Sequence, residues 1–348
     1  MSKKIVISGN PFVHGMNGIP RYEFEILKRI DLMFTENSDV ELAVPADVKF
    51  DYAFKNIKVV RLANYCKLWD LRVLDKYAKK QNAVCVLFDN NGSMRVDSVV
   101  CIHDLIPIEI SKLSPKLKKD FTRQRLIMKF NLRLIKRKAK FVATVSNYSK
   151  ALIESYINRR VTVIGSGYEH ILDIAEDGGI FTKYPRIHSQ EYYFSIGNLA
   201  PHKNLNWVLK NAALYHENTY VIAGKAVASL KDDTSCNVPK NVIFVGYIDD
   251  GEMKSLMKNA KALLFPTFME GFGLPPLEAL ALGTQAVVSD IPCLNEIYGK
   301  SVHYIDPNDF NVDLNNILND PVESPQRVLS EHTWQKSAEK WFNLINEL

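Results

Sequence analysis

Nine short apolar runs recur along the chain, and each is followed by a polar turn and then by a helical pattern. The runs are KIVISG, VCVLF, SVVCIHD and FVATVS, and then YYFSIGN, TYVIAG, VIFVGY, KALLFPT and QAVVSD. Strands that alternate with helices form parallel sheets with both faces covered. The pattern therefore predicts an α/β fold built on parallel sheets.

The length of the chain and one turn-rich gap predict two domains. The chain has 348 residues, more than one ordinary hydrophobic core accommodates. The turn-rich stretch GGIFTKYPRIHSQE separates FVATVS from YYFSIGN. We expect a first domain at residues 1–177, a linker at 178–191, a second domain at 192–330 and a terminal helix at 331–348. The apolar face of that helix comprises Trp334, Ala338, Trp341 and Ile345.

The composition excludes several classes of protein. With 47% hydrophobic and 24% charged residues, the chain is expected to be globular. Its five cysteines are scattered without a C-x-x-C pair, which argues against a disulfide framework or a zinc site. The apolar run near the N-terminus is shorter than a signal-peptide core, and no later stretch approaches a membrane span. We expect a cytoplasmic protein.

Residues 266–284, PTFMEGFGLPPLEALALGT, contain more glycine and proline than a helix alone would tolerate. We expect a buried strand at 261–267, a loop, and a helix that starts at Pro275 or Pro276 and ends at Gly283. The helix N-terminus would make an anion site in the loop. Gly271 and Gly273 would let a phosphate or a sugar hydroxyl approach the backbone closely.

Two glutamates, Glu270 and Glu278, flank this loop with seven residues between them. One suits a position near a reacting group, and the other suits hydrogen bonds from a diol such as ribose. In the simpler interpretation, Glu278 only complements the helix dipole and Glu270 caps a turn. A retaining glycosidase needs carboxyls about 5 to 5.5 Å apart. Eight helical residues span about 12 Å, so hydrolysis is disfavoured.

The stretch E-G-F-G-L-P-P-L-E-A resembles the signature of family 4 (group 1) retaining glycosyltransferases of GT-B fold. Further stretches in the expected order extend the resemblance over nearly the whole chain. It implies two Rossmann-like domains whose parallel sheets face a central cleft. The first domain would bind the acceptor and the second the nucleotide sugar, and the C-terminal helix would cross back to the first domain.

The resemblance implies three catalytic residues, Glu270, His103 and Lys203. Lys203, in FSIGNLAPHKNLNWVLKNA, matches the basic residue that grips the donor diphosphate, and Asn198 stands where the family often has Arg, Ser or Thr. His103, in VVCIHDLIPIEI, matches the place that contacts the transferred sugar. Glu270 would orient the sugar or stabilise positive charge, and Glu278 would hold the ribose.

The resemblance also implies further donor contacts and a glycine loop. The donor contacts follow KALLFPT and VIFVGY, at Gly271, Phe272, Gly273, Leu274, Gly246, Tyr247 and Ile248. VHGMNGIPRYEFEILKRI resembles the family's glycine-rich loop, with Gly15, Gly18 and Arg21. Pro20 stands where a glycine often sits, so this loop is expected to be stiffer than usual.

The sequence contains no Asp-x-Asp, the motif with which many sugar transferases hold a metal-bound diphosphate. Charge compensation would then come from Lys203 and from helix N-termini. We expect an enzyme that needs neither a metal nor another cofactor.

Residues 111–140 hold twelve Lys or Arg against Asp120 alone. Within this basic segment, helical spacing links Leu117, Phe121, Met128, Leu132 and Ile135. A basic amphipathic helix at 112–140 could lie on anionic lipid at the inner face of the cell membrane. There it would reach a polyprenyl-diphosphate-linked saccharide. Alternatively, the apolar stripe packs on the sheet and the charges face water.

The resemblance implies transfer of a hexosyl group from a nucleotide-diphosphate sugar to a glycan or lipid-linked saccharide, in bacterial surface polysaccharide such as lipopolysaccharide. GDP-mannose is the first candidate donor, followed by UDP- or dTDP-sugars. A nucleotide-sugar epimerase or glycan phosphorylase of GT-B shape remains an alternative. A nucleic-acid-binding protein using residues 112–140 is another, although that segment lacks interleaved solvent-facing aromatics and no RNP signature accompanies it. We therefore expect no nucleic-acid partner.

Overall fold

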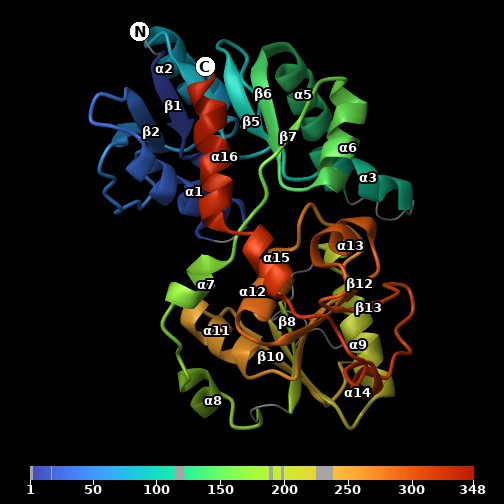
Figure 1. Ribbon diagram of the computed structural model, residues 1–348. Helices are drawn as coiled ribbons and strands as arrows, with labels where there is room; N and C mark the ends of the chain where they lie inside the picture. The colour runs from blue at the N-terminus through green and yellow to red at the C-terminus, as the bar shows by residue number, and fades with distance from the viewer. Residues whose placement is uncertain (1–2, 17, 114–120, 188–190, 197–199, 225–237) are drawn as a thin grey trace. The chain divides into compact units, whose positions relative to one another are not determined.

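The computed structural model describes residues 3–16, 18–113, 121–187, 191–196, 200–224 and 238–348. They form two compact units (Figure 1). The first unit consists of residues up to Ser166 together with His332–Leu348, and the second unit is Gly167–Glu331. The structure thus places the boundary earlier than the expected end of the first domain at residue 177.

The first unit contains a parallel sheet whose described strands run in the order β3-β2-β1-β4-β5-β6-β7. The strand order reverses between β1 and β4, because β1 continues toward β2 on one side and β4 toward β5 on the other. The strands are β1 (Ile5–Ser8), β2 (Val40–Pro45), β3 (Lys58–Leu62), β4 (Val84–Leu87), β5 (Ser98–Cys101), β6 (Ala139–Thr144) and β7 (Thr162–Val163).

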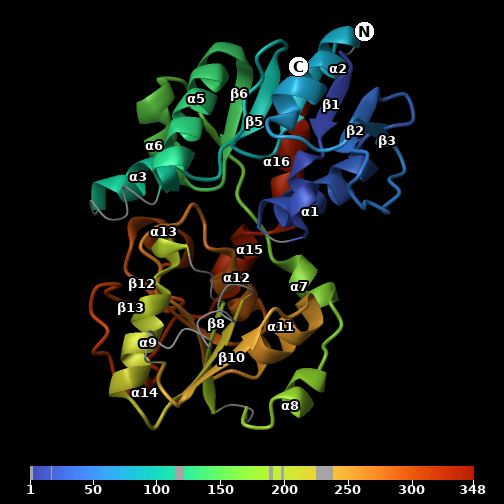
Figure 2. The ribbon, with the colours of Figure 1, turned by 180° about the vertical axis from the view of Figure 1, so that it is seen from behind.

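Helices cover both faces of this sheet (Figures 1 and 2). They are η1 (Asn10–His14), α1 (Ile19–Met33), η2 (Asp70–Leu74), α2 (Asp75–Lys80), α3 (Ile106–Leu113), α5 (Thr122–Lys138), α6 (Asn147–Ile157) and α16 (Trp334–Asn346). The C-terminal helix α16 packs along α1, as the red and blue helices of Figure 1 show. Its four expected apolar residues are all buried, and the indole of Trp341 donates a hydrogen bond to the Tyr22 hydroxyl at 2.8 Å. Helix α16 thus belongs to the first unit, together with residues up to Ser166.

The second unit contains a parallel sheet whose described strands run in the order β10-β9-β8-β11-β12-β13. Here the order reverses between β8 and β11. The strands are β8 (Tyr192–Ile196), β9 (Thr219–Ala223), β10 (Val242–Gly246), β11 (Ala262–Phe265), β12 (Gln285–Ser289) and β13 (His303–Ile305). The helices are α7 (Glu169–Asp173), α8 (Gly179–Lys183), η3 (Pro201–Lys203), α9 (Leu205–Leu214), α11 (Asp250–Lys258), α12 (Leu274–Ala281), α13 (Pro292–Tyr298), α14 (Leu314–Ile317) and α15 (Gln326–Glu331).

The residues expected to form a linker, 178–191, are part of the second unit. Helix α8 lies within them and packs on α11. The Tyr184 hydroxyl donates to the carbonyl of Val245 at 3.0 Å, and the Arg186 guanidinium donates to the carbonyl of Lys240 at 3.0 Å. These bonds fasten the segment to β10 and its flanking turn, so its turn-rich sequence reflects a packed surface rather than a free connection.

The basic segment has its apolar stripe in the core of the first unit. Met128, Leu132 and Ile135 on α5 are buried within the cluster that covers the sheet. The expected stripe member Leu117 lies outside the described residues. Another face of α5 exposes Leu126 (62%), Ile127 (42%) and Phe130 (41%) among basic side chains, which the spacing did not predict. Among the described residues, none of the helices is both long and apolar enough to cross a membrane.

Candidate active site

The site loops of the second unit follow the two strands between which the sheet order reverses. Lys203 lies in η3 after β8, and Glu270 lies in the loop after β11, the neighbouring strand. In open parallel sheets the loops at the carboxyl ends of such strands flank a crevice in which ligands bind. The topology therefore brings together two residues that are 67 positions apart in the chain.

Hydrogen bonds hold these two loops against each other. The carbonyl of His202 accepts from the backbone N–H of Phe268 at 2.8 Å and from the Thr267 hydroxyl at 2.8 Å. The side-chain amide of Asn204, the residue before α9, donates to the carbonyl of Pro266 at 2.9 Å. The backbone on either side of Lys203 is thus fixed relative to the loop that carries Glu270.

Lys203 and Glu270 form an ion pair. The Lys203 ammonium lies 2.7 Å from Oε1 of Glu270 and 5.1 Å from the ring centroid of Phe265, at the end of β11. Both side chains are largely withdrawn from solvent, so the hydrogen bond is charge-assisted and weakly screened. Burial also lowers the pKa of the neighbouring His202 to about 4, which makes that imidazole neutral near pH 7.

Glu278 is the fifth residue of α12, so it lies in the second turn of that helix. Its Oε1 lies 3.0 Å from Nε2 of His170, which is on α7. Both side chains are buried, at 4% exposure for His170 and 7% for Glu278. His170 was not among the expected site residues, because it lies 108 residues from its partner and no local motif marks it.

The two glutamates share one arrangement. In each, Oε1 meets a basic group from another element, and within the described part of the chain no donor lies on Oε2. A carboxylate oxygen has two lone pairs and accepts hydrogen bonds from hydroxyl groups. The site therefore presents one ammonium and two carboxylate oxygens that a polyhydroxyl ligand with a phosphate could engage.

Helix α12 begins and ends near the expected residues. It spans Leu274–Ala281, and Gly283 follows it with a φ of +79°, as a terminating glycine does. Its first turn contains Pro275 and Pro276, which have no N–H to donate. The helix dipole still points into the loop, but most N–H donors for an anion would have to come from the residues that precede the prolines.

Gly273 is required by the packing of the loop. Its φ is +91°, a conformation that residues with a side chain rarely adopt. A Cβ on it would lie 2.8 Å from Cδ2 of Leu294 and 3.4 Å from the ring of Phe265. The Tyr298 hydroxyl donates to its carbonyl. The glycine thus lets buried Phe272 and the start of α12 sit against α13, a packing role that was not expected beside close approach of a ligand.

The other residues expected to contact the donor follow a different strand from Lys203 and Glu270, or they lie outside the described residues. Asn198 is among the residues that the structure does not describe. Gly246 is the last residue of β10, the edge strand of the sheet, and Tyr247 and Ile248 follow it; Tyr247 is 66% exposed. Their assignment to the nucleobase stays a prediction.

The expected glycine loop lies between η1 and α1 in the first unit. Gly15 and Gly18 have φ of +84° and +55°, and a Cβ on either would meet no atom within 4 Å. Gly18 caps the N-terminus of α1, and Arg21 is the third residue of that helix. Because space is open around both positions, their positive φ is enough to explain why glycine is found there.

His103 follows β5 in the first unit. Its Nε2 lies 2.7 Å from the carbonyl of Phe88, which can only accept, so Nε2 carries the hydrogen. Its backbone N–H donates to Oδ1 of Asn90 at 2.8 Å. Burial lowers the pKa of the ring to about 4, and the neutral imidazole then has Nδ1 as a hydrogen-bond acceptor.

Three acidic side chains near the β1–β4 reversal were not anticipated. Asp70 accepts from the Ser8 hydroxyl at 2.5 Å and from the Asn10 amide at 2.8 Å, and burial raises its pKa to about 6. Burial and the charges of Asp89 and Asp70 raise the pKa of Glu23, whose carboxyl oxygens have no hydrogen-bond partner among the described residues. Nowhere in the described ranges do three or more Asp, Glu, His or Cys form a group that could hold a metal ion.

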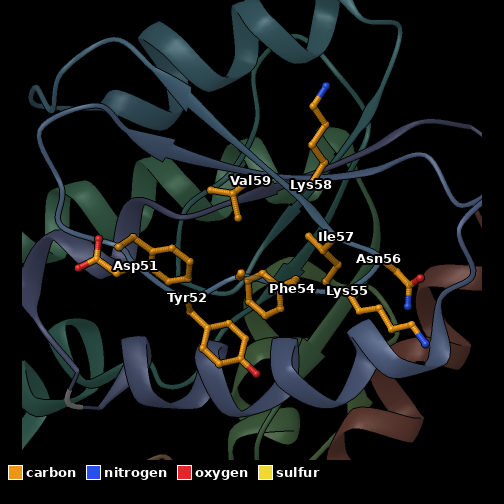
Figure 3. A pocket seen from close by; sticks show the side chains of 10 residues that line it. Asp51, Tyr52, Phe54, Lys55, Asn56, Ile57, Lys58 and Val59 are labelled. Atoms are coloured by element: carbon orange, nitrogen blue, oxygen red, sulfur yellow. The ribbon is translucent and has the colours of Figure 1, made fainter.

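Figure 3 shows a surface depression of the first unit that contains none of the expected site residues. It is lined by residues 50–59, which comprise part of the segment between β2 and β3 and the first two residues of β3. The ring of Tyr52 meets Phe24 of α1 edge-on at 5.0 Å, and Phe54 meets Tyr52 at 4.8 Å. These aromatic contacts hold the connecting segment on α1.

Comparison with known proteins identifies a family model and several relatives that resemble this chain. The family described as Glycosyl transferases group 1 matches residues 179–341. The O-antigen chain mannosyltransferase RfbU of Salmonella typhimurium is 28% identical over 244 residues, which are 69% of this chain and 64% of that protein. The O-antigen chain mannosyltransferase B of Escherichia coli is 24% identical over 376 residues, 96% of this chain and 93% of that protein.

Solved structures share the fold. The sucrose-phosphate synthase of Thermosynechococcus elongatus superimposes with a TM-score of 0.75 at 15% identity, over 99% of this chain and 98% of that one. WaaG, a glycosyltransferase involved in lipopolysaccharide biosynthesis, gives a TM-score of 0.67 at 14% identity, over 97% and 95%. Anabaena HepE in complex with UDP-glucose gives 0.65 at 19% identity, over 99% and 97%. The expected GT-B class of α/β fold is confirmed.

Proposed function

We propose that this chain, whose residues 179–341 match the family described as Glycosyl transferases group 1, is a glycosyltransferase of that group. It would move a hexosyl group from a nucleotide-diphosphate sugar to a glycan or lipid-linked saccharide. The observation that carries the proposal is the pair of glutamates beside Lys203. Each glutamate has one oxygen held by a basic group and one without a described partner. The ammonium of such a site can bind a diphosphate, and its carboxylates can accept hydrogen bonds from sugar hydroxyl groups.

Mannose is the first candidate for the transferred sugar. Both RfbU and mannosyltransferase B are named as O-antigen chain mannosyltransferases, which supports GDP-mannose as the donor and bacterial surface polysaccharide as the product. UDP-sugars come next, since HepE is solved with UDP-glucose, and dTDP-sugars follow. The acceptor would be a growing glycan or a polyprenyl-diphosphate-linked saccharide.

The charged residues of the site would have separate roles in the transfer. The Lys203 ammonium would stabilise the nucleoside diphosphate as the bond from its oxygen to the anomeric carbon breaks. As Lys203 turns to the phosphate, the Glu270 carboxylate would orient the sugar or stabilise positive charge at the anomeric carbon. Glu278 would accept hydrogen bonds from the ribose. We propose that the acceptor hydroxyl attacks from the face that the diphosphate leaves and passes its proton to the departing phosphate oxygen, with retention of configuration.

We propose that transfer needs no metal ion. The sequence contains no Asp-x-Asp, while Lys203 and the positive end of the α12 dipole lie at the loop where the diphosphate would bind. Turnover should therefore continue when a chelator removes divalent cations. Loss of turnover in the chelator would contradict this part of the proposal.

We also propose that the enzyme works at the inner face of the cell membrane. Helix α5 exposes Leu126, Ile127 and Phe130 beside a high density of basic residues. Apolar side chains within a cationic surface favour binding to anionic lipid, where the basic groups meet head groups and the apolar groups enter the interface. This surface would bring the enzyme to a lipid-linked acceptor.

Calorimetric binding of GDP-mannose, UDP-glucose and dTDP-sugars tests the donor site. We expect at least one of them to bind, and Lys203→Ala to weaken that binding about 10- to 100-fold, since it removes a charge-assisted hydrogen bond worth about 1.5–3 kcal/mol. Lys258→Ala is the matched control. Lys258 lies in the same unit and also pairs with a glutamate, Glu176, at 2.5 Å. The Lys258→Ala variant should bind the nucleotide sugar with an affinity within about twofold of that of the native chain.

Two results would contradict the proposed function. One is that no nucleotide sugar binds the native chain. The other is that a donor binds Lys203→Ala as tightly as it binds the native chain.

A further inference from the structure

The contact between His170 and Glu278 joins two segments of the second unit that are far apart in the chain. Helix α7 packs on α12, and this contact sets Nε2 of His170 3.0 Å from Oε1 of Glu278. Neither side chain has more than a few per cent of its surface in solvent. A buried carboxylate without a partner is strongly destabilising, so this glutamate depends on the histidine for its place in the fold.

The geometry of the contact restricts how Glu278 can turn. An ionised carboxylate only accepts hydrogen bonds, so Nε2 of His170 carries the hydrogen. With Oε1 held by the ring, rotation about the last side-chain bond of Glu278 would break a buried hydrogen bond. The imidazole is rigid and enclosed, so Oε2 is left in one orientation. In the described structure, Oε2 is the oxygen without a protein partner.

The partner of Glu270, Lys203, has a more flexible and more exposed side chain than His170, the partner of Glu278. Lys203 has a flexible stem, 24% of its side chain is exposed, and it can leave Glu270 for a phosphate. The His170 side chain is 4% exposed and short, so it cannot leave Glu278 without unpacking α7. One glutamate therefore has an exchangeable partner, and the other has a fixed one.

We propose that His170 is a positioning residue for nucleotide recognition, which holds Glu278 so that Oε2 accepts from a ribose hydroxyl of the donor. The inference rests on the proposed function, and it deepens that function by naming the substrate class: a ribonucleoside diphosphate, distinguished from its 2′-deoxy counterpart. His170 acts through Glu278 and touches no reacting atom. Its effect should fall on donor affinity and on the choice of sugar in the nucleoside, not on the chemical step.

The experiment compares GDP with 2′-deoxy-GDP, and UDP with 2′-deoxy-UDP, by calorimetry. We expect the native chain to prefer the ribose form about 10- to 100-fold, which is the range for a hydrogen bond to a charged group. His170→Phe keeps a ring but loses the donor, and the preference should fall to about threefold or less. His170→Gln offers an amide N–H in place of the ring N–H and should restore much of the preference. A purely structural loss would weaken both forms equally.

His303→Phe is the matched control. Its ring Nε2 lies 2.8 Å from Oε1 of Gln285, so it is another buried histidine of the second unit bonded to a side-chain oxygen. This variant should keep the ribose preference of the native chain. In steady-state assays, His170→Phe should raise KM for the donor about tenfold while kcat changes by less than about threefold.

The outcomes separate the inference from the function on which it rests. Absence of any nucleoside diphosphate binding by the native chain would remove the proposed function. Binding without a ribose preference, or a preference unchanged in a folded His170→Phe variant, would overturn the role of His170 alone. Should His170→Phe not fold, His170→Leu replaces it, because it also removes the donor and asks less space of the surrounding side chains.

Discussion

Burial sets the protonation of two histidines, His103 in the first unit and His202 in the second. It lowers the pKa of His103 and of His202 to about 4, so both rings are neutral at the pH of a cell. For His103 the hydrogen lies on Nε2, because that atom meets the carbonyl of Phe88. A neutral ring with a fixed tautomer presents an acceptor, not a cation, to a sugar hydroxyl.

The lowered pKa of His103 predicts acid sensitivity of the first unit. The unfolded ring takes up its proton near pH 6.5, whereas the folded ring does so only near pH 4. The stability that the neutral ring contributes is therefore present above pH 6.5 and is lost as the pH falls toward 4. Relative to His103→Gln, the free energy of unfolding of the native chain should drop by up to about 3 kcal/mol over this interval.

Urea unfolding at pH 7 and at pH 4.5 measures this difference. NMR titration gives a direct check, since the ring resonance that disappears in His103→Gln should titrate near pH 4 in the native chain. Titration near pH 6.5 would show that the ring is open to water and would contradict the argument.

At the scale of elements, the sequence predicted the strands that carry the site but not all the strands of the sheets. The nine apolar runs match β1, β4, β5, β6 and β8 to β12. These runs leave out β2, β3, β13 and the two-residue strand β7. β3 is an edge strand with exposed Lys58 and Arg61, and β13 has three residues, so neither forms an apolar run. β2, at VELAVP, is interrupted by a glutamate that pairs with Lys4.

Side-chain contacts between residues far apart in the sequence could not be predicted, and the site depends on several of them. The loop from Glu270 to Gly283 has its glycines, prolines and helix where the local sequence indicates, because turn chemistry is local. The contact of Glu278 with His170 depends on how α7 packs against α12, and nothing near either residue signals it. The segment 178–191 was assigned as a linker for the same reason, since its bonds to Lys240 and Val245 involve distant residues.

Helix α5 leads to a prediction about membranes. The native chain should float with vesicles that contain anionic lipid, and less so as salt rises, because salt screens the basic residues. Leu126→Ser with Phe130→Ser should lower binding roughly tenfold, since each side chain would otherwise bury part of its apolar surface in the interface. Flotation on a density gradient measures this effect.

Leu214→Ser is the control for the flotation experiment. Leu214 is 49% exposed on α9 of the second unit, away from any basic segment, so its loss should not change binding. Equal binding to neutral vesicles, or no binding to anionic ones, would refute the membrane proposal.

At the scale of the whole molecule, the chain consists of two units with separate cores, and its last helix belongs to the first of them. Trp341 of α16 is fully buried, bonds to Tyr22 of α1 and meets the ring of Phe88 at 4.6 Å. These contacts join the C-terminal helix to the N-terminal part of the chain and complete the core of the first unit. The second unit has its own buried tryptophan, Trp207, which donates to the carbonyl of Asp309 at 2.7 Å.

Trp341→Ala should destabilise the first unit by about 3–5 kcal/mol, because it leaves a cavity and removes a hydrogen bond. For a unit of this size that loss corresponds to a fall in Tm of roughly 10 °C. Trp207→Ala is the matched change in the second unit and should lower the other transition. Calorimetry of both variants assigns the transitions. A fall in the same transition for both would contradict separate cores.

The placement of α16 has a consequence for synthesis on the ribosome. Nascent chains ordinarily fold from the N-terminus as each domain emerges. Here the opening 166 residues leave the ribosome without the helix that covers α1, and they wait until all of the second unit has been made. During that interval Tyr22 and its neighbours present an uncovered apolar surface. Chaperone occupancy of the nascent protein should therefore persist until α16 has emerged from the ribosome.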